Sequence, residues 1–189
     1  MKKCFIVSPI GDRDSTIREQ ADHVLKYLIE PVCKELGLES IRADKKCTPG
    51  SISQAVFKDL DDSDIVIADL TGLNANVMLE IGYRLSNKRP YVLIRNEEDA
   101  EKIPFDIQDY RIYVYSLKRD REEECKETIK NFINDALKEN DEFFKSLHIR
   151  KANGRIVQLC DADGVTFPKS QVPDKWRKTL MERAKVTEW

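Results

Sequence analysis

The segment IVIADLTGLNANVMLEIG, residues 65–82, decides the fold because it joins a buried strand to a helix through a polar loop. Four consecutive apolar residues, 65–68, are typical of a strand that is covered on both faces, as in a parallel sheet. The loop 70–75 contains Thr, Gly and Asn, and the apolar residues after it recur at helical spacing, which predicts a helix over 76–86. A strand, a loop and a helix in this order form half of a βαβ unit.

The sequence on either side of this segment alternates in the same way between short apolar runs and stretches with helical periodicity. The expected strands are residues 4–7, 38–43, 65–69, 90–94 and 111–115, and the expected helices are residues 17–32, 52–60, 76–86 and 121–138. This alternation indicates an α/β domain over residues 1–140, with a parallel sheet and helices on both faces. Right-handed crossovers and a short first strand favour a flavodoxin-like, doubly wound, five-stranded sheet of order 2-1-3-4-5.

The last part of the chain, residues 141–189, follows a different pattern. Residues 155–160 and 165–167 flank the sequence Asp-Ala-Asp-Gly, which predicts a β-hairpin, and residues 174–185 predict a short amphipathic helix. We expect a small hairpin-plus-helix extension that packs on the α/β domain, covers its site or mediates self-association.

The composition excludes several classes of partner. Charged residues make up 35% of the 189 residues, but the net charge is only −2, so the chain lacks the basic excess of proteins that bind nucleic acid or anionic membranes. No apolar stretch reaches the 18 residues of a membrane span. We therefore expect neither nucleic acid nor a membrane among its partners.

The cysteines indicate a reducing compartment and no metal site. The five cysteines form no CxxC pair, and the two histidines are far apart in the sequence, so no zinc-ligand spacing exists. Cys4, Cys33 and Cys125 fall at apolar positions of expected elements, where a free thiol behaves as a small hydrophobic side chain. We expect a cytoplasmic protein without a bound metal or other cofactor.

Two polar loops mark the expected position of a site. In open parallel sheets, ligands bind beyond the carboxyl ends of the strands, where the strand order switches, and here this point lies between the first and third strands. The loops that meet there are residues 8–12 and 69–76, both rich in Gly, Asn, Asp, Ser or Thr, which suit a sugar or a phosphate. Neither contains a dinucleotide-binding GxGxxG or a P-loop pattern. Alternatively, Gly11 and Gly72 are turn glycines with positive φ.

Glu80 is the best candidate for a chemical role. Asn76 lies four residues before it and shares its helix face, whereas Val77 and Ile81 must face the core. Because helical side chains lean towards the N-terminus, Glu80 can point back to the loop. The alternative is a surface ion pair between Glu80 and Arg84, four residues apart, which would contribute a few tenths of a kcal/mol.

Three further charged residues are candidates for the site, and each also has a purely structural interpretation. Asp69 ends the third strand, where an Asp often caps a turn, and Asp44 at the end of the second strand has the same alternative. Arg18 can hold an anion near the first loop, or it can pair with Asp14 or Asp22 on its own helix.

Four segments of this sequence together resemble the nucleoside 2-deoxyribosyltransferase-like superfamily, and within it an uncharacterised bacterial branch. The segments are CFIVSPIG (4–11), IREQAD (17–22), RAD (42–44) and IADLTGLNANVMLEIG (67–82). The resemblance covers about residues 3–116, and its most specific part is the last of these segments.

The resemblance implies chemistry at a glycosidic bond. In the transferases, the Glu at the position of Glu80 attacks the anomeric carbon of a deoxynucleoside, so that a glycosyl-enzyme ester forms and the free base leaves. Asp69 would assist, and the loop residues would bind a nucleoside, nucleotide or NAD-like ligand. Members of the superfamily often form homo-oligomers that complete one another's sites. The residues that we expect to bind the substrate are Ser8, Pro9, Gly11, Arg18, Asp44, Thr71, Gly72, Asn74 and Asn76.

One departure from the family pattern leaves the function open. Asn74 stands six residues before Glu80, where true transferases commonly carry an Asp, and an amide cannot balance a positive charge as a carboxylate does. TIR domains resemble this architecture too, and some of them cleave NAD with a Glu on the corresponding helix. The alternatives are therefore an N-glycoside hydrolase or transferase, a nucleotide-binding sensor without turnover, and a TIR-like interaction scaffold.

Overall fold

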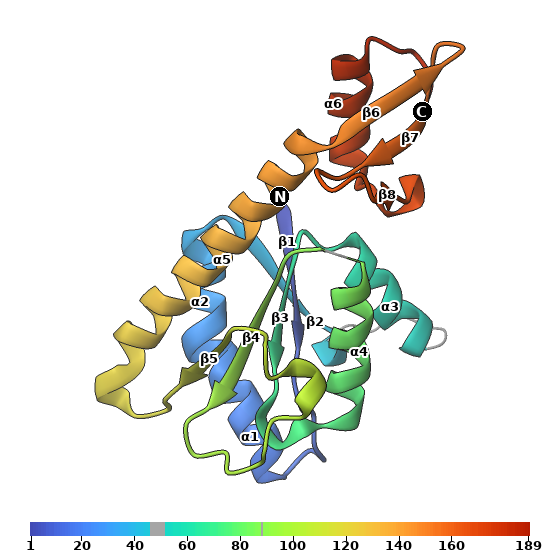
Figure 1. Ribbon diagram of the computed structural model, residues 1–189. Helices are drawn as coiled ribbons and strands as arrows, with labels where there is room; N and C mark the ends of the chain where they lie inside the picture. Colours follow the sequence, from blue (N-terminus) through green and yellow to red (C-terminus); the bar gives the residue numbers. More distant parts are fainter. Residues whose placement is uncertain (46–51, 88) are drawn as a thin grey trace. The chain divides into compact units, whose positions relative to one another are not determined.

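The computed structural model describes residues 1–45, 52–87 and 89–189, and the chain divides into two compact units, residues 1–137 and 138–189 (Figure 1). The first unit contains a five-stranded parallel sheet of order β2-β1-β3-β4-β5, which confirms the predicted strand order. Its strands are β1 (Lys2–Val7), β2 (Leu38–Arg42), β3 (Ile65–Asp69), β4 (Tyr91–Asn96) and β5 (Ile112–Tyr115).

Helices cover both faces of this sheet (Figure 1). One face packs against α1 (Thr16–His23), the π-helix η1 (Val24–Ile29), α2 (Glu30–Glu35) and the beginning of α5 (Glu122–Ser146). The other face packs against α3 (Ile52–Asp62) and α4 (Ala75–Ser86). The short helices η2 (Ala43–Lys45), η3 (Thr71–Leu73), η4 (Phe105–Ile107) and η5 (Arg119–Arg121) lie in the connections.

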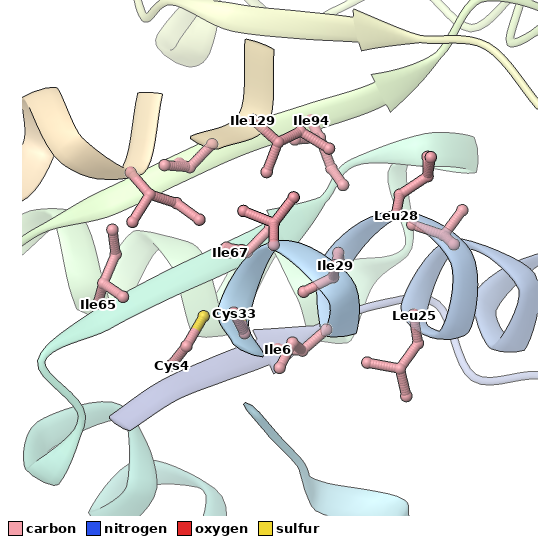
Figure 2. Packing of buried hydrophobic residues seen from close by; sticks show 14 of the residues in the cluster. Cys4, Ile6, Leu25, Leu28, Ile29, Cys33, Ile65, Ile67, Ile94 and Ile129 are labelled. Atoms are coloured by element: carbon pink, nitrogen blue, oxygen red, sulfur yellow. The ribbon is translucent and has the colours of Figure 1, made fainter. Parts of the chain in front are cut away.

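Strand residues alternate between the two cores, as the period of two requires. Ile65 and Ile67 of β3 belong to the core under η1, α2 and α5, whereas Val66 and Ala68 belong to the core under α3 and α4. Figure 2 shows the first core, in which Cys4, Ile6, Ile65 and Ile67 of the sheet pack with Leu25, Leu28, Ile29 and Cys33 of the helical segment. Cys4, Cys33 and Cys125 are buried, as predicted.

The second unit is a small three-stranded antiparallel sheet with a helix. It contains β6 (His148–Ala152), β7 (Arg155–Cys160), β8 (Thr166–Phe167), the short helix η6 (Lys169–Gln171) and α6 (Asp174–Ala184). Phe144, near the end of α5, stacks on Trp176 of α6 with 5.4 Å between ring centroids. The predicted β7–β8 hairpin and the final helix are confirmed, but the end of α5 predicted at residue 138 is wrong, because the helix continues to Ser146.

Strand β6 is absent from the prediction. Its sequence, HIRKA, shows no run of apolar residues, and four of its five residues are exposed. Asn153 and Gly154, both with positive φ, form the turn to β7, and this Asn-Gly pair was the available sequence signal.

No helix in the described part of the chain is both long and apolar enough to cross a membrane.

Candidate functional site

A cavity of about 110 Å³ lies at the carboxyl ends of β1 and β3, beside the predicted switch point. Both polar loops contribute to it, and α1 forms the remaining wall. Its lining residues are Pro9, Ile17, Gln20, Ala21, Asp69, Thr71, Gly72 and Asn74. Five of these were predicted as site residues. Ile17, at the start of the helix predicted over residues 17–32, is 52% exposed and lines the cavity.

Asp69 lies at the base of a buried hydrogen-bond network. Its Oδ1 accepts hydrogen bonds from the Thr71 amide (3.0 Å) and the Thr71 hydroxyl (2.5 Å), and its Oδ2 accepts one from the Tyr115 hydroxyl (2.9 Å). Burial raises the pKa of Asp69, although the hydrogen bonds from Thr71 and Tyr115 partly oppose this effect. Burial and the charge of Asp69 also raise the pKa of Tyr115, so this hydroxyl stays protonated and remains a donor.

The network reaches two other elements. The hydroxyl of Thr71 accepts a hydrogen bond from the backbone amide of Asn96 at the end of β4 (3.0 Å). The side-chain amide of Gln20 on α1 donates to the Tyr115 hydroxyl (3.3 Å). Asp69 therefore caps the turn at the end of β3 through Thr71, as its structural alternative predicted. It also contributes to the cavity wall.

The rest of the loop is fixed by Gly72 and Asn74. Gly72 has a φ of 69°, as its turn alternative required, and its amide donates to the carboxylate of Asp99 (2.9 Å). The side-chain Oδ1 of Asn74 accepts from the backbone amides of Asn76 (3.0 Å) and Val77 (3.4 Å), so Asn74 is the N-cap of α4. The residue that departs from the family pattern thus positions the helix that carries Glu80.

Glu80 is half-buried, and burial raises the pKa of its carboxyl group. Within the described residues, its carboxylate has neither a hydrogen-bond donor nor a cationic partner. The alternative of a surface pair with Arg84 is wrong, because Arg84 is 1% exposed and donates to the backbone carbonyls of Leu60, Ser63 and Pro90. Desolvation lowers the pKa of this buried guanidinium to about 9.

The two predicted catalytic carboxylates belong to elements in different layers, strand β3 and helix α4. Asp69 lies on the same face of β3 as Ile65 and Ile67. Its carboxylate is hydrogen-bonded to Tyr115, so Asp69 faces the layer of α1 and α5. Helix α4, which carries Glu80, packs on the other face through Val77 and Ile81. The structure therefore does not pair Asp69 with Glu80, and the 110 Å³ cavity is not lined by Glu80.

Arg18 and Asp44 belong to an ion-pair cluster beside the cavity. Arg18 bonds to Asp44 (2.6 Å) and to Asp22 (3.4 Å), so the Asp22 alternative is confirmed and Asp14 is not its partner. Arg42, a residue that sequence reasoning missed, is 2% exposed and also bonds to Asp44 (2.6 Å) and Asp22. The guanidinium of Arg18 is thus already neutralised by carboxylates.

Ser8, Gly11 and Asn76, also predicted to bind substrate, do not line the cavity. The hydroxyl of Ser8 is buried and has no hydrogen-bond partner in the described structure. Gly11 does not have a positive φ, so the turn alternative is wrong for it. A Cβ at this position would lie 2.3 Å from Oγ of Ser15, which caps α1, and this close approach explains the glycine.

Sequence reasoning also missed Gln20 and Tyr115. Gln20 lies three residues after Ile17 on the same helix, and Tyr115 is 46 residues from its partner Asp69. Among the described residues, no cluster of His, Cys, Asp or Glu is arranged to hold a metal ion.

No protein-family model matches the chain, and no curated protein matches it. Similar solved structures include a 2-deoxyribosyltransferase from Bacillus psychrosaccharolyticus, with 19% identity and a TM-score of 0.44 over 71% of this chain and 95% of that one. A conserved protein from Enterococcus faecalis has 14% identity and a TM-score of 0.42 over 74% and 99% of the two chains. The constitutive lysine decarboxylase of E. coli has 12% identity and a TM-score of 0.45 over 81% of this chain, which spans 21% of that protein. These similarities concern the fold alone.

Proposed function

We propose that this chain cleaves or transfers the N-glycosidic bond of a nucleoside, nucleotide or NAD-like ligand, with Glu80 as nucleophile or as stabiliser of the oxocarbenium ion. The observation that carries the proposal is the half-buried carboxyl group of Glu80, which has no partner among the described residues. The sequence resemblance over residues 67–82 supports the same role.

An uncompensated carboxylate is costly in a folded protein. Partial burial removes water from the charged form, and neither a cation nor a hydrogen-bond donor in the described chain replaces that water. Carboxylates in such surroundings are candidates for functional groups, because a cationic transition state can provide the missing partner.

The proposed step needs no metal ion. The carboxylate of Glu80 forms a bond to the anomeric carbon while the C–N bond breaks, and the electron pair leaves with the base, which takes up a proton. Water then attacks the glycosyl ester in a hydrolase, or a second base attacks it in a transferase. In either case Glu80 is regenerated.

The residues around the cavity have a supporting role in this proposal. Asp69 holds Thr71, and Asn74 caps α4, so the two together fix the loop that leads to Glu80. We place the activity in residues 1–140, with 141–189 as an extension, and in a homo-oligomer in a reducing cytoplasm.

A second candidate function is ligand binding without turnover, as in a nucleotide sensor. The observation that favours it is Asn74, whose side-chain oxygen is committed to the helix cap and whose amide provides no negative charge. A sensor would show a ligand-induced rise in melting temperature without release of base. A TIR-like scaffold would be indifferent to Glu80→Ala in binding and in its biological output.

The decisive experiment measures free base released from a panel of nucleosides, nucleotides and NAD. We expect release by the unmodified chain and at least a hundredfold loss in Glu80→Gln, whose neutral amide keeps the shape but cannot attack. Glu139→Gln, at an exposed position of α5, is the matched control and should retain full activity. Equal activity of Glu80→Gln and the unmodified chain would refute the role of Glu80.

A further inference from the structure

The hydrogen-bond network fixes the orientation of the Gln20 side chain. An ionised carboxylate only accepts hydrogen bonds, so Tyr115 donates its proton to Asp69 (2.9 Å). The Tyr115 oxygen is then left as an acceptor. The Thr71 hydroxyl lies 3.3 Å from it but already donates its proton to Asp69, so the donor to Tyr115 is the NH₂ of Gln20 (3.3 Å). The carbonyl oxygen of Gln20, a residue that lines the cavity, consequently has no partner in the described part of the chain.

The helix cap fixes the orientation of the Asn74 side-chain amide, and in this residue the free group is the donor. The backbone amides of Asn76 and Val77 only donate, so the Asn74 atom that they contact is the carbonyl Oδ1. The NH₂ of Asn74 is left without a partner among the described residues, and Asn74 also lines the cavity. The two amide side chains therefore offer one free acceptor and one free donor.

The remaining lining argues against an anionic ligand. Among the described residues, the cavity is lined by no Lys, Arg or His, and the single ionisable residue in its lining is Asp69. The nearby cation, Arg18, is bonded to Asp22 and Asp44. Pro9, Ile17 and Ala21 give the cavity an apolar side that suits a flat ring. Its volume of about 110 Å³ is below the roughly 300–1,000 Å³ of pockets for larger ligands.

We infer that this cavity recognises an uncharged amide-like group on a small heterocycle, either the lactam edge of a nucleobase or a carboxamide. The ligand's N–H donates to the carbonyl of Gln20, and its C=O accepts from the NH₂ of Asn74. This inference rests on the proposed function in that the heterocycle would be the base of the cleaved ligand. Gln20 and Asn74 are then specificity-determining residues, and any phosphate of the ligand lies outside the cavity.

The first test measures binding of free compounds to the full chain by calorimetry. We expect uracil, nicotinamide or both to bind, and binding of one alone identifies the lactam or the carboxamide as the group recognised. 3-Acetylpyridine keeps the ring and the carbonyl of nicotinamide but lacks its N–H, and nicotinate replaces the amide by an anion. Each should bind at least tenfold more weakly than nicotinamide, because one hydrogen bond is lost or a charge faces Asp69. Failure of both uracil and nicotinamide to bind, or equal binding of inorganic phosphate, overturns the inference.

The second test uses variants that separate recognition from stability. Asn74→Asp keeps the oxygen that caps α4 but removes the NH₂ donor, so binding should weaken about tenfold while the melting temperature stays the same. Gln20→Met removes the free carbonyl and should weaken binding by a similar factor, with a lower melting temperature because the hydrogen bond to Tyr115 is lost as well. Gln54→Met, at an exposed position of α3, is the matched control. Unchanged affinity in both Asn74→Asp and Gln20→Met refutes the assignment.

Glu80→Gln distinguishes this inference from the proposed function. Because Glu80 does not line the cavity, Glu80→Gln should bind the free heterocycle as tightly as the unmodified chain, even when base release is lost. Tight binding without any turnover supports the inference and contradicts the glycosidase. Base release without the amide selectivity supports the glycosidase and contradicts the inference.

Discussion

Replacing Tyr115 by Phe removes one oxygen atom from the centre of the network and leaves the aromatic ring in place. Tyr115 is fully buried, and its hydroxyl both donates to Asp69 (2.9 Å) and accepts from Gln20 (3.3 Å). In the variant, Asp69 retains only its hydrogen bonds from Thr71. The Gln20 amide also loses the contact that fixes its orientation.

The magnitude follows from the charge of the acceptor. A hydrogen bond to an ionised group contributes about 1.5–3 kcal/mol, so we expect the free energy of unfolding to fall by about 2 kcal/mol at pH 7.5. The pKa of Asp69 is raised by burial, and the Tyr115 hydrogen bond opposes that rise, so the variant raises the pKa further. The folded state then binds its proton more tightly than the unfolded state, and stability falls as the pH rises through this range. The loss should therefore be smaller at pH 4 than at pH 7.5, because a larger fraction of Asp69 is protonated at the lower pH.

The assay is urea unfolding at pH 7.5 and pH 4, followed by circular dichroism and by tryptophan fluorescence. Trp176 and Trp189 are the two tryptophans of the chain, and both lie in unit 138–189, so circular dichroism must be used to follow the α/β unit. Tyr27→Phe, at a 40% exposed position, provides the control for loss of a tyrosine hydroxyl. An unchanged free energy at pH 7.5, or a loss that is larger at pH 4 than at pH 7.5, would refute the reasoning.

Three other substitutions test local parts of the structure, each by urea or thermal unfolding. Asn74→Ala removes the N-cap of α4 and should cost about 1 kcal/mol, whereas Asn74→Asp should cost almost nothing; similar losses in both would contradict the capping role. Gly11→Ala places a Cβ 2.3 Å from Oγ of Ser15 and displaces the cap of α1, for a loss of about 1 kcal/mol or more. Gly82→Ala, at an exposed position of α4, meets no atom within 4 Å and should stabilise the helix by up to about 1 kcal/mol. Phe144→Ala removes a buried ring that stacks on Trp176 and should cost about 3–5 kcal/mol in the transition seen by fluorescence; a change confined to circular dichroism would show that Phe144 does not support that unit.

Periodicity was sufficient to predict the parallel sheet and its strand order. The alternation of apolar strands with helical stripes leaves few topologies once crossovers are right-handed, and the observed order β2-β1-β3-β4-β5 is the expected one. Helical periodicity also predicts that Arg84 is buried. It lies seven residues after Val77, two helical turns away, and therefore on the buried face. The alternative of a surface pair followed only from the spacing of four residues between Glu80 and Arg84.

The composition of the cavity could be predicted only in part. The loop residues Asp69, Thr71, Gly72 and Asn74 follow one another in the sequence, and a strand-end loop is a sufficient signal for them. Gln20 and Tyr115 come from other elements, and their roles depend on which side chain at the end of each strand faces α1. That orientation is decided by tertiary packing, which the local pattern does not contain.

The loop between β3 and α4 is held at three separate places, and this has a consequence for binding. Thr71 is bonded to Asp69 and to the Asn96 amide, Gly72 is bonded to Asp99, and Asn74 is bonded to the first turn of α4. A wall fixed in this way exists before the ligand arrives, so little conformational entropy is lost when the ligand binds. Selectivity must then come from the free polar atoms that the wall presents rather than from closure of the loop. The orientations of the Gln20 and Asn74 amides, each set by a partner that can only donate or only accept, are therefore the features on which recognition at this cavity depends.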